Sequence, residues 1–549
     1  MNKKQLKILG VLLLSTLFIS LTIEITSPTT LYRDPWDWRH LAGTNKIIEE
    51  KSLPTESELS LKGNQDPASY AYAQEIIQYP APNILLAVLV ILCGIDIAFF
   101  LNSFYIMLFI LGLSLFILFR KVFGNDLLAL CGSVIFMFFP FETIYFKTSL
   151  DGTPLSQIFY FVSFYFLINA IIVCKKKENG LTKNVFFVLF FMLMGIISYK
   201  AAGLLFSILP LLFFVLVYLF WKKNPLKNKG FKFKIFFIAS VLVVVSFLIF
   251  LFLNFTENYA LSPVMAAAYN IKNLNLIPSF IFWSVPSAQY YLKTSLGYHI
   301  LRYVIPFVFL AFLLLINFKK IEWYLNKDRL VFSFVVSQSI FYFIMGGLFL
   351  YSLPFVSLRG IGFILWISML LNVIGIFLMK GKKRIILATL FFILVCIVPF
   401  SIYTQSPAYK YNQFNLQEEK SIEWVNLQIK ESKHIYSDIK MGGAIFALNE
   451  NRNVFHASAD IGKAGETEIT PIFYDSNIEK SIEALEWYGT DYLILTNDMT
   501  EIAFQPKNEL FHPTSSKILS KYNNSNKFNK VFENSYVRIY GIDRGEKEK

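Results

Sequence analysis

Long apolar runs, separated by short polar loops rich in lysine, make up most of the chain as far as residue 404. A helix that crosses a bilayer needs roughly 20 mostly apolar residues. The runs therefore predict an α-helical polytopic membrane protein with about 11 spanning helices. The predicted spans are residues 8–26, 102–119, 127–146, 154–174, 184–199, 203–221, 235–254, 299–318, 331–351, 360–379 and 385–403.

The first apolar run has two interpretations. Lys3, Lys4 and Lys7 precede it, as in the basic start of a signal peptide. No small-x-small cleavage site comes before Pro28, and the run is long. We therefore favour an uncleaved first span.

The distribution of lysine and arginine predicts the orientation. With the amino terminus in the cytoplasm, the cytoplasmic segments collect 23 basic residues and four acidic ones. Such a bias is the positive-inside pattern of proteins in the cytoplasmic (plasma) membrane. Eleven spans then place both the first loop, residues 27–81, and the carboxyl-terminal segment outside.

Residues 82–100 are apolar enough to span, but only Asn102 and Ser103 separate them from the next run. A span here would move every later basic loop to the outside. We therefore predict a helix that lies at the outer interface, with a twelfth span as the alternative.

Residues 405–549 form a second, polar domain after the membrane part, residues 1–404. About 145 residues suffice for one independent α/β domain. Its predicted helices are Ser421–Ile429 and Glu479–Tyr488, and its predicted strands are Asp491–Thr496 and Val531–Ile542, the latter turning at Asn534-Ser535.

Composition agrees with this organisation and excludes several classes of protein. The chain is 55% hydrophobic, 17% aromatic and only 16% charged, whereas soluble domains carry about a quarter charged residues. A soluble enzyme and a disordered chain are thereby excluded. The net charge of +13 suggests nucleic acid as a partner, but the lysines lie in membrane-flanking loops, so no nucleic-acid partner is expected. The four cysteines have no metal-ligand spacing and read as small apolar residues.

The densest chemistry follows the first span. A stretch of eight residues contains two tryptophans together with Asp34, Asp37, Arg39 and His40. An interfacial belt explains the tryptophans and arginines, but not the paired aspartates. Carboxylates at this place can bind a hard divalent cation such as Mg²⁺ or Mn²⁺, or accept a proton from an acceptor hydroxyl.

A second acidic position is predicted on the same side. Asp151 lies in the tight outer loop before the span at 154–174, shortly after Lys147. Taken alone, Asp151 is explained as an ordinary residue that caps the helix. Beside Asp34 and Asp37 it becomes a candidate catalytic residue or metal ligand, because carboxylates gathered on one face need a cation to offset their repulsion.

Basic residues on the outer side are scarce. Arg359 offers a planar fork for phosphate oxygens, with a snorkelling interfacial arginine as the alternative. Lys200, His299 and Arg302, together with Lys147, are candidates for lining the same outer cavity. Lys200 interrupts an apolar run, where an unpaired charge usually marks a partner or a wet cavity.

The sequence carries no Gly-rich phosphate loop, no HExxH and no GxSxG motif, and its cytoplasmic loops are short. A cytoplasmic nucleotide-sugar enzyme and an ATP-driven pump are therefore not expected. A donor substrate, if the chain uses one, should be borne by the membrane.

The order of motifs resembles the GT-C glycosyltransferase superfamily, which includes oligosaccharyltransferases, protein O-mannosyltransferases and aminoarabinose transferases. The resemblance rests on Asp-Pro-Trp and Arg-His-Leu-Ala in residues 34–42, on Ile47–Glu50 with Leu53-Pro54, and on Tyr79–Pro82 before an interfacial helix. It implies a catalytic aspartate at Asp34 or Asp37, a second acid at Asp151, and a donor phosphate held by Arg359. It also implies substrate contacts from Arg39 and His40, and an extracytoplasmic terminal domain.

The resemblance implies that a sugar passes from a polyprenyl-phosphate donor to a glycan, lipid or protein acceptor outside the membrane. The WWD-type motif of oligosaccharyltransferases is missing, which favours a single sugar or small glycan over oligosaccharyl transfer to protein. A transporter or lipid flippase would show repeated halves or mid-membrane charges, which are not visible. A non-catalytic membrane anchor for the terminal domain is the remaining alternative.

Overall fold

The structure is a computed structural model of the 549-residue chain. The residues it describes are 3–26, 44–45, 47–48, 51, 80–94, 105–138, 152–176, 179–198, 200–220, 286–350, 368–398, 414–448, 453–457, 471–487, 489–501 and 514–543. They fall into two compact units, which are considered separately.

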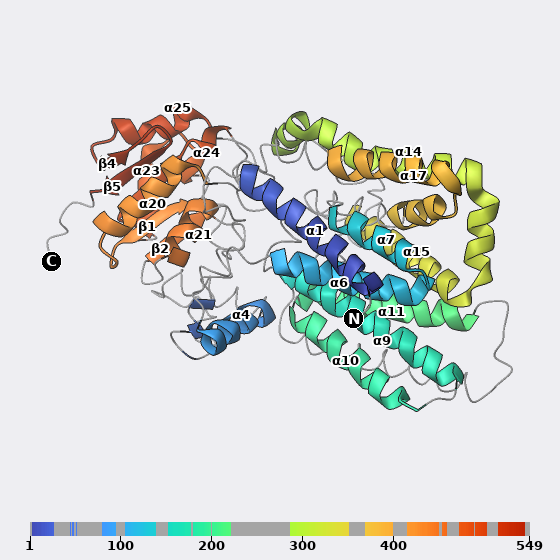
Figure 1. The fold of residues 1–549 in the computed structure, drawn as a ribbon. Helices are drawn as coiled ribbons and strands as arrows, with labels where there is room; N and C mark the ends of the chain where they lie inside the picture. Colours follow the sequence, from blue (N-terminus) through green and yellow to red (C-terminus); the bar gives the residue numbers. More distant parts are fainter. Residues whose placement is uncertain are drawn as a thin grey trace, which may run out of the picture. The chain divides into compact units, whose positions relative to one another are not determined.

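The first unit, called the helical unit below, is a bundle of apolar helices (Figure 1). Their bounds are α1 (Lys3–Thr26), α6 (Tyr105–Phe123), α7 (Asp126–Phe138), α9 (Gly152–Lys176), α10 (Leu181–Ser198), α11 (Lys200–Phe220), α14 (Pro286–Lys327), α15 (Arg329–Leu350) and α17 (Gly381–Phe392), followed by the π-helix η3 (Ile393–Ile397). The unit takes in α1 as far as Leu21 and α14 from Gly297. Among the described residues, five helices are long and apolar enough to cross a membrane. A helix suits this task because it satisfies its backbone hydrogen bonds internally.

The helices pack through aromatic side chains and close glycine contacts. Phe164 of α9 lies against Phe214 of α11 and Phe334 of α15, with ring centroids 4.9 and 5.3 Å apart. Between α6 and α7, Gly132 leaves room for the ring of Phe119. A Cβ at Gly132 would stand 2.7 Å from that ring. Small residues of this kind let membrane helices approach closely.

Hydrogen bonds between neutral groups link some of the polar side chains buried between these helices. The hydroxyl of Tyr160 on α9 donates to Oε1 of Gln338 on α15 at 2.8 Å. Asn372 donates to the carbonyl of Pro306 inside α14 at 3.0 Å. Interhelical hydrogen bonds of this type are a common source of helix association in membranes.

The second unit contains the C-terminal domain, which is built on a five-stranded sheet. The domain elements are α20 (Leu416–Gln428), β1 (His434–Asp438), α21 (Ile439–Leu448), β2 (Asn453–Ala457), α23 (Ile478–Trp487), β3 (Tyr492–Thr496), α24 (Asp498–Glu501), α25 (Ser516–Leu519), the 3-10 helix η4 (Ser520–Asn524), β4 (Phe528–Glu533) and β5 (Val537–Ile542). The strand order is β2-β1-β3-β5-β4. The strands β2, β1 and β3 run parallel, and the β4–β5 hairpin continues the sheet antiparallel to β3.

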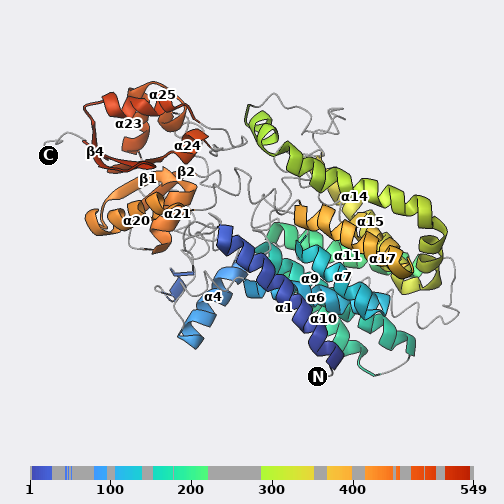
Figure 2. The same cartoon turned by 45° about the horizontal axis from the view of Figure 1, so that its top comes forward.

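Helices cover both faces of this sheet. Figure 2 shows α23 and α25 on one side of the strands and α20 and α21 on the other. On the α23 side, Leu485 packs with Tyr436, Leu493 and Tyr540 of the strands in one buried apolar cluster. The result is a three-layer α/β domain with a core of its own.

The described helices agree with most of the predicted spans. Described helices overlap every predicted span except residues 235–254, which lie outside the described residues. Residues 139–146, 360–367 and 399–403, which belong to other predicted spans, also lie outside them. The total of about 11 spans therefore stays a prediction. The residues predicted to lie at the interface contain α4 (Pro80–Cys93), which ends at Gly94 with φ of +61°. Whether α4 lies at the interface or spans the membrane stays a prediction too.

In the C-terminal domain, the two predicted helices correspond to α20 and α23, and the predicted strand and hairpin correspond to β3 and β4–β5. The sequence did not predict β1, α21 or β2. The mostly helical architecture with a C-terminal α/β sheet is confirmed, while its extracytoplasmic location stays a prediction.

Candidate functional site

Most of the residues predicted to carry the chemistry lie outside the described residues. These are Asp34, Asp37, Arg39, His40, Lys147, Asp151 and Arg359. Their convergence on one outer cavity therefore stays a prediction. No group of three metal-ligating side chains occurs among the residues that the structure does describe. The predicted ligands Asp34, Asp37 and Asp151 are not among them.

The backbone is described at three of the predicted cavity residues, all in the helical unit. Lys200 is the first residue of α11, and His299 and Arg302 lie in α14. A separation of three residues places His299 and Arg302 on one face of that helix. In addition, α9 begins at Gly152, directly after Asp151, where the sequence predicts a helix start.

The most developed polar site in the described part of the chain lies in the C-terminal domain, and it begins with a helix cap. Asn415 precedes α20, and its side-chain oxygen accepts hydrogen bonds from the amides of Gln417 and Glu418 at 2.9 and 3.0 Å. The carboxylate of Glu418 accepts in return from the Asn415 amide at 2.9 Å. This reciprocal pair is a capping box, which satisfies the free amides of the first turn.

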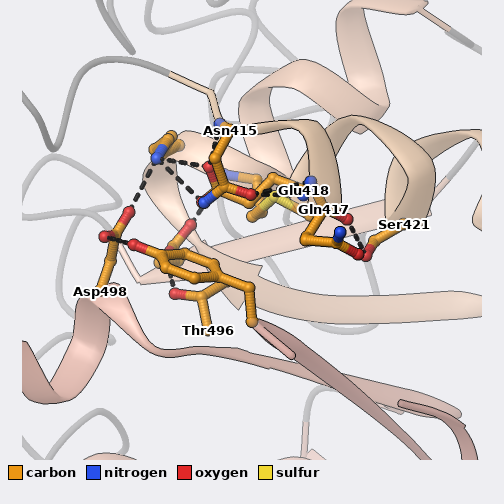
Figure 3. A network of polar contacts seen from close by, with 10 residues as sticks. Asn415, Gln417, Glu418, Ser421, Thr496 and Asp498 are labelled. Atoms are coloured by element: carbon orange, nitrogen blue, oxygen red, sulfur yellow. Dashed lines mark hydrogen bonds and ion pairs between the residues drawn. The ribbon is translucent and has the colours of Figure 1, made fainter. Parts of the chain in front are cut away.

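The same carboxylate takes part in a buried cluster of charges. The ammonium of Lys440, on α21, lies 2.8 Å from Oε1 of Glu418 and 2.7 Å from Oδ2 of Asp498 on α24. All three side chains are at most 1% exposed. These three residues are called the Glu418–Lys440–Asp498 triad below. Figure 3 shows two of them, Glu418 and Asp498, which approach from different elements. Charges buried so completely need both pairing and hydrogen bonds.

Neighbouring groups complete the network. The hydroxyl of Tyr536 donates to the other carboxylate oxygen of Asp498. Asp438, at the end of β1, accepts from the amide of Met441 at 2.7 Å and from the hydroxyl of Thr496 at 3.3 Å. Every carboxylate of the network therefore has at least two donors.

Burial shapes the protonation of these groups. It raises the pKa of Glu418 to about 8, although the Lys440 ammonium acts in the opposite direction. Burial disfavours the charge on Lys440, but Glu418 and Asp498 together outweigh it and raise the Lys440 pKa above its ordinary value. Burial also raises the pKa of Asp438 to about 6, against the hydrogen bond from Met441. Burial thus opposes charge on both carboxyl groups, and the Lys440 ammonium is the counter-charge that favours the ionised form of Glu418.

The network lies at the carboxyl ends of β1 and β3. Within the sheet, β2 and β3 are the two neighbours of β1. The chain passes from β1 to β2 on one side of β1 and then crosses to β3 on the other side of β1. Such a reversal in strand order is where open α/β sheets commonly bind ligands. Here Lys440 and its partners fill that position, and they are closed to solvent. The charges at this position are therefore paired with one another.

Sequence reasoning missed this network because its partners are far apart along the chain. Lys440 is 22 residues from Glu418 and 58 from Asp498. The usable signal was local: Asn415 followed three residues later by Glu418 is the pattern of a capping box. Nothing in that pattern indicates the lysine.

Comparisons with known proteins identify the fold. No protein-family model and no curated protein matches the sequence. The structure is similar to the crystal structure of the Archaeoglobus fulgidus oligosaccharyltransferase tethered with an acceptor peptide that contains the NVT sequon. The TM-score is 0.57 at 13% identity, and the match covers 90% of this chain and 69% of that one.

Two further structures of the archaeal enzyme give the same result. The oligosaccharyltransferase AglB from Archaeoglobus fulgidus, in complex with an inhibitory peptide and a dolichol-phosphate, matches with a TM-score of 0.55 at 10% identity, over 91% of this chain and 70% of that one. The apo form of the Archaeoglobus fulgidus enzyme matches with a TM-score of 0.56 at 14% identity, over 90% and 70%.

These matches show that the fold of the chain is similar to that of archaeal oligosaccharyltransferase. The GT-C resemblance predicted from the sequence is thereby confirmed at the level of the fold. With its apolar helices of spanning length, the chain is a membrane protein. At 10–14% identity the likeness concerns the fold alone.

Proposed function

We propose that the chain is a membrane glycosyltransferase that moves a sugar or small glycan from a polyprenyl-phosphate donor to an acceptor on the outer face of the membrane. The observation that carries the proposal is the fold likeness to archaeal oligosaccharyltransferase over 90% of the chain. One of the similar structures holds a dolichol-phosphate, which is a lipid phosphate of the proposed donor class.

The proposed chemistry assigns the catalytic roles to the first outer loop. Asp34 or Asp37 acts as the general base toward the acceptor hydroxyl or binds a divalent cation, and Asp151 supports it. Carboxylate oxygens are the ligands that Mg²⁺ and Mn²⁺ prefer. When bound, such a cation would offset negative charge on the phosphate that leaves.

The donor phosphate is proposed to bind at Arg359. A guanidinium can hold two phosphate oxygens at once and keeps its charge at every physiological pH. Lys147, Lys200, His299 and Arg302 are proposed to line the outer cavity, with Arg39 and His40 close to the aspartates. Stabilisation of the leaving phosphate is the main contribution that these residues can make to the rate.

The test is a transfer assay with the purified protein, a labelled polyprenyl-phosphate sugar and extracts of the outer surface as acceptors. We expect Asp34→Asn, Asp37→Asn or Asp151→Asn to lower transfer by about 100-fold or more if the residue is the base. Glu322→Gln is the matched control, because Glu322 is an exposed carboxylate on α14, remote in sequence from these loops. Full transfer by all three asparagine variants would refute the proposed mechanism. An absence of transfer by the wild type from any polyprenyl-phosphate donor would refute the function.

Transfer of a glycan to protein is the second candidate. The observation in its favour is the acceptor peptide bound to one of the similar structures. Against it stands the missing WWD-type motif in residues 405–549. A sequon peptide added to the same assay separates the two: labelled peptide supports protein glycosylation, and labelled lipid or glycan supports the first candidate.

A further inference from the structure

A large apolar cavity lies inside the helical unit, among α1, α7, α17 and the helix segment Ser368–Phe377. Its volume is about 490 Å³. Roughly 300–1,000 Å³ is the range of cavities that hold small molecules in proteins. Its wall includes Val11 of α1, Val134 of α7, Ile376 of the segment and Phe391 of α17.

The cavity can be reached from the surface of the bundle. Leu127 and Ile385, both in its wall, are 49% and 65% exposed, and Cys131 is exposed as well. An apolar wall that opens toward the lipid-facing side of a helix bundle is suited to a hydrocarbon chain.

One charged side chain lines the cavity among the described residues, and it is a cation. Arg384 lies half-buried in the first turn of α17. Lys380, Lys382 and Lys383 stand exposed just before it, and residues 380–398 contain no acidic residue. Within the described part of the chain, no carboxylate lies at ion-pair distance from Arg384.

The neighbouring basic residues differ in this respect. Lys4 and Arg120 line an adjacent polar cavity of about 420 Å³, which shares Leu127 with the apolar one. Both are paired with the carboxylate of Asp126, each at 2.6 Å. Asp126 therefore offsets one of these two positive charges, whereas in the described part of the chain no carboxylate offsets the group around Arg384.

We propose that this cavity binds an acyl chain of an anionic membrane phospholipid, with its phosphate held by Arg384 and the lysines before it. Basic pockets between spanning helices and lysine-rich segments beside them are typical binding places for anionic lipid headgroups. The bilayer phospholipid is the occupant favoured here because the charge stands at the end of a helix, where headgroups lie, and the apolar wall follows directly along α17. The inference is independent of the proposed transferase activity.

The test uses photoactivatable phospholipids in vesicles of phosphatidylcholine that contain the full-length protein. A diazirine in the acyl chain is carried either by phosphatidylglycerol or by phosphatidylcholine, and the adducts are mapped by peptide mass spectrometry. We expect phosphatidylglycerol to label α7 and α17 several-fold more than phosphatidylcholine does. Arg384→Gln should lower this labelling by about fivefold, the factor that one basic residue contributes at a membrane surface.

Two further variants make the result specific. Ala388→Phe places a ring in the cavity and should abolish labelling of its wall while Arg384 stays in place. Lys320→Gln, which removes an exposed charge on α14, should leave the labelling unchanged.

Equal labelling by both lipids, or equal effects of Arg384→Gln and Lys320→Gln, would overturn the proposal. If polyprenyl phosphate displaces the photoactivatable lipid at a lower concentration than phosphatidylglycerol does, the choice of lipid is overturned. If two copies of the protein cross-link through Cys131 and the lipid label is then excluded from the cavity, the occupant is a second copy of the chain instead.

Discussion

The helical unit and the C-terminal domain bury polar side chains in different ways. Between the membrane helices, a hydrogen bond between Tyr160 and Gln338 joins two neutral side chains, and the guanidinium of Arg329 donates to backbone carbonyls of α11. In the C-terminal domain, the Glu418–Lys440–Asp498 triad concentrates three ionisable groups at one position. The difference reflects the surroundings. A bilayer offers no water to a polar group that has lost its partner. In a water-exposed domain, a network of hydrogen bonds and ion pairs can offset a buried charge.

The comparison also predicts different sensitivities. Removing one partner of a neutral pair leaves a dipole behind, whereas removing one partner of a charged triad leaves an uncompensated charge. The C-terminal domain should therefore depend strongly on a few residues. The helical unit should depend more on shape, as at Gly132.

The largest expected effect is that of Lys440→Met. It leaves Glu418 and Asp498 buried without their cation, which should cost roughly 3–5 kcal/mol of the free energy of unfolding of the C-terminal domain. Hydrogen exchange of the sheet amides in the full-length protein measures this loss. Lys433→Met is the control, because the Lys433–Asp491 pair is partly exposed and surface pairs contribute about 0–1 kcal/mol. Equal losses for both variants would show that the triad is no stronger than a surface pair.

The next effect is a pH dependence that arises from Glu418. Its pKa rises from an ordinary 4.5 to about 8 on folding, so folding takes up a proton between these values. Stability should therefore fall as the pH rises toward 8, by up to about 1.4 kcal/mol per pH unit. Asp438 acts in the same direction only up to about pH 6, so the range from pH 6 to 8 isolates Glu418.

Glu418→Gln tests this dependence, since the amide does not titrate. Denaturant unfolding of the C-terminal domain at several pH values should show a flatter slope for the variant between pH 6 and 8. Glu423→Gln, an exposed position on the same helix, should keep the slope of the wild type. An unchanged slope in Glu418→Gln would assign the pH dependence to another group.

A smaller effect is expected from Gly132→Ala in the helical unit. The added Cβ would stand 2.7 Å from the buried ring of Phe119, and overpacking of this kind costs roughly 1–3 kcal/mol. Gly10→Ala adds the same group to α1, where nothing lies within 4 Å. Thermal unfolding in detergent should therefore show a loss for Gly132→Ala and no loss for Gly10→Ala. A gain for both would mean that helix propensity outweighs packing at the α6–α7 contact.

The smallest effect should come from Gln338→Leu. It removes the acceptor of the Tyr160 hydroxyl, and such bonds contribute about 0.6 kcal/mol in membrane proteins. Nε2 of Gln338 has no hydrogen-bond partner among the described residues, so its loss offsets part of the cost. Thermal unfolding of Gln338→Leu and of Tyr160→Phe/Gln338→Leu should differ little from the wild type. A loss as large as that of Lys440→Met would remove the contrast between the two regions.

Local patterns predicted much of this fold. The apolar runs identify the membrane helices because their signal is long and continuous. The hairpin turn was also predictable, since Asn534 accepts hydrogen bonds from the amides of Tyr536 and Val537 with its side chain. Asparagine favours turns through such local bonds.

What the sequence did not reveal depends on contacts between distant residues. The strands β1 and β2 have five residues each and gain their definition from pairing with each other. Lys440 stands in a mixed polar and apolar segment where a surface position is the usual expectation. The candidate catalytic loops are predicted from residue types and from the resemblance. Their geometry lies outside the described residues, so Asp34, Asp37 and Asp151 stay predictions.

Glu418 caps the first turn of α20 and also binds Lys440, and this double role has a mechanical consequence. A pull on the chain ahead of Asn415 reaches the capping box first and is passed through Glu418 to Lys440 and Asp498, at the carboxyl ends of β1 and β3. The load therefore meets a buried cluster of paired charges. Under force, α20 should stay attached until the sheet itself yields.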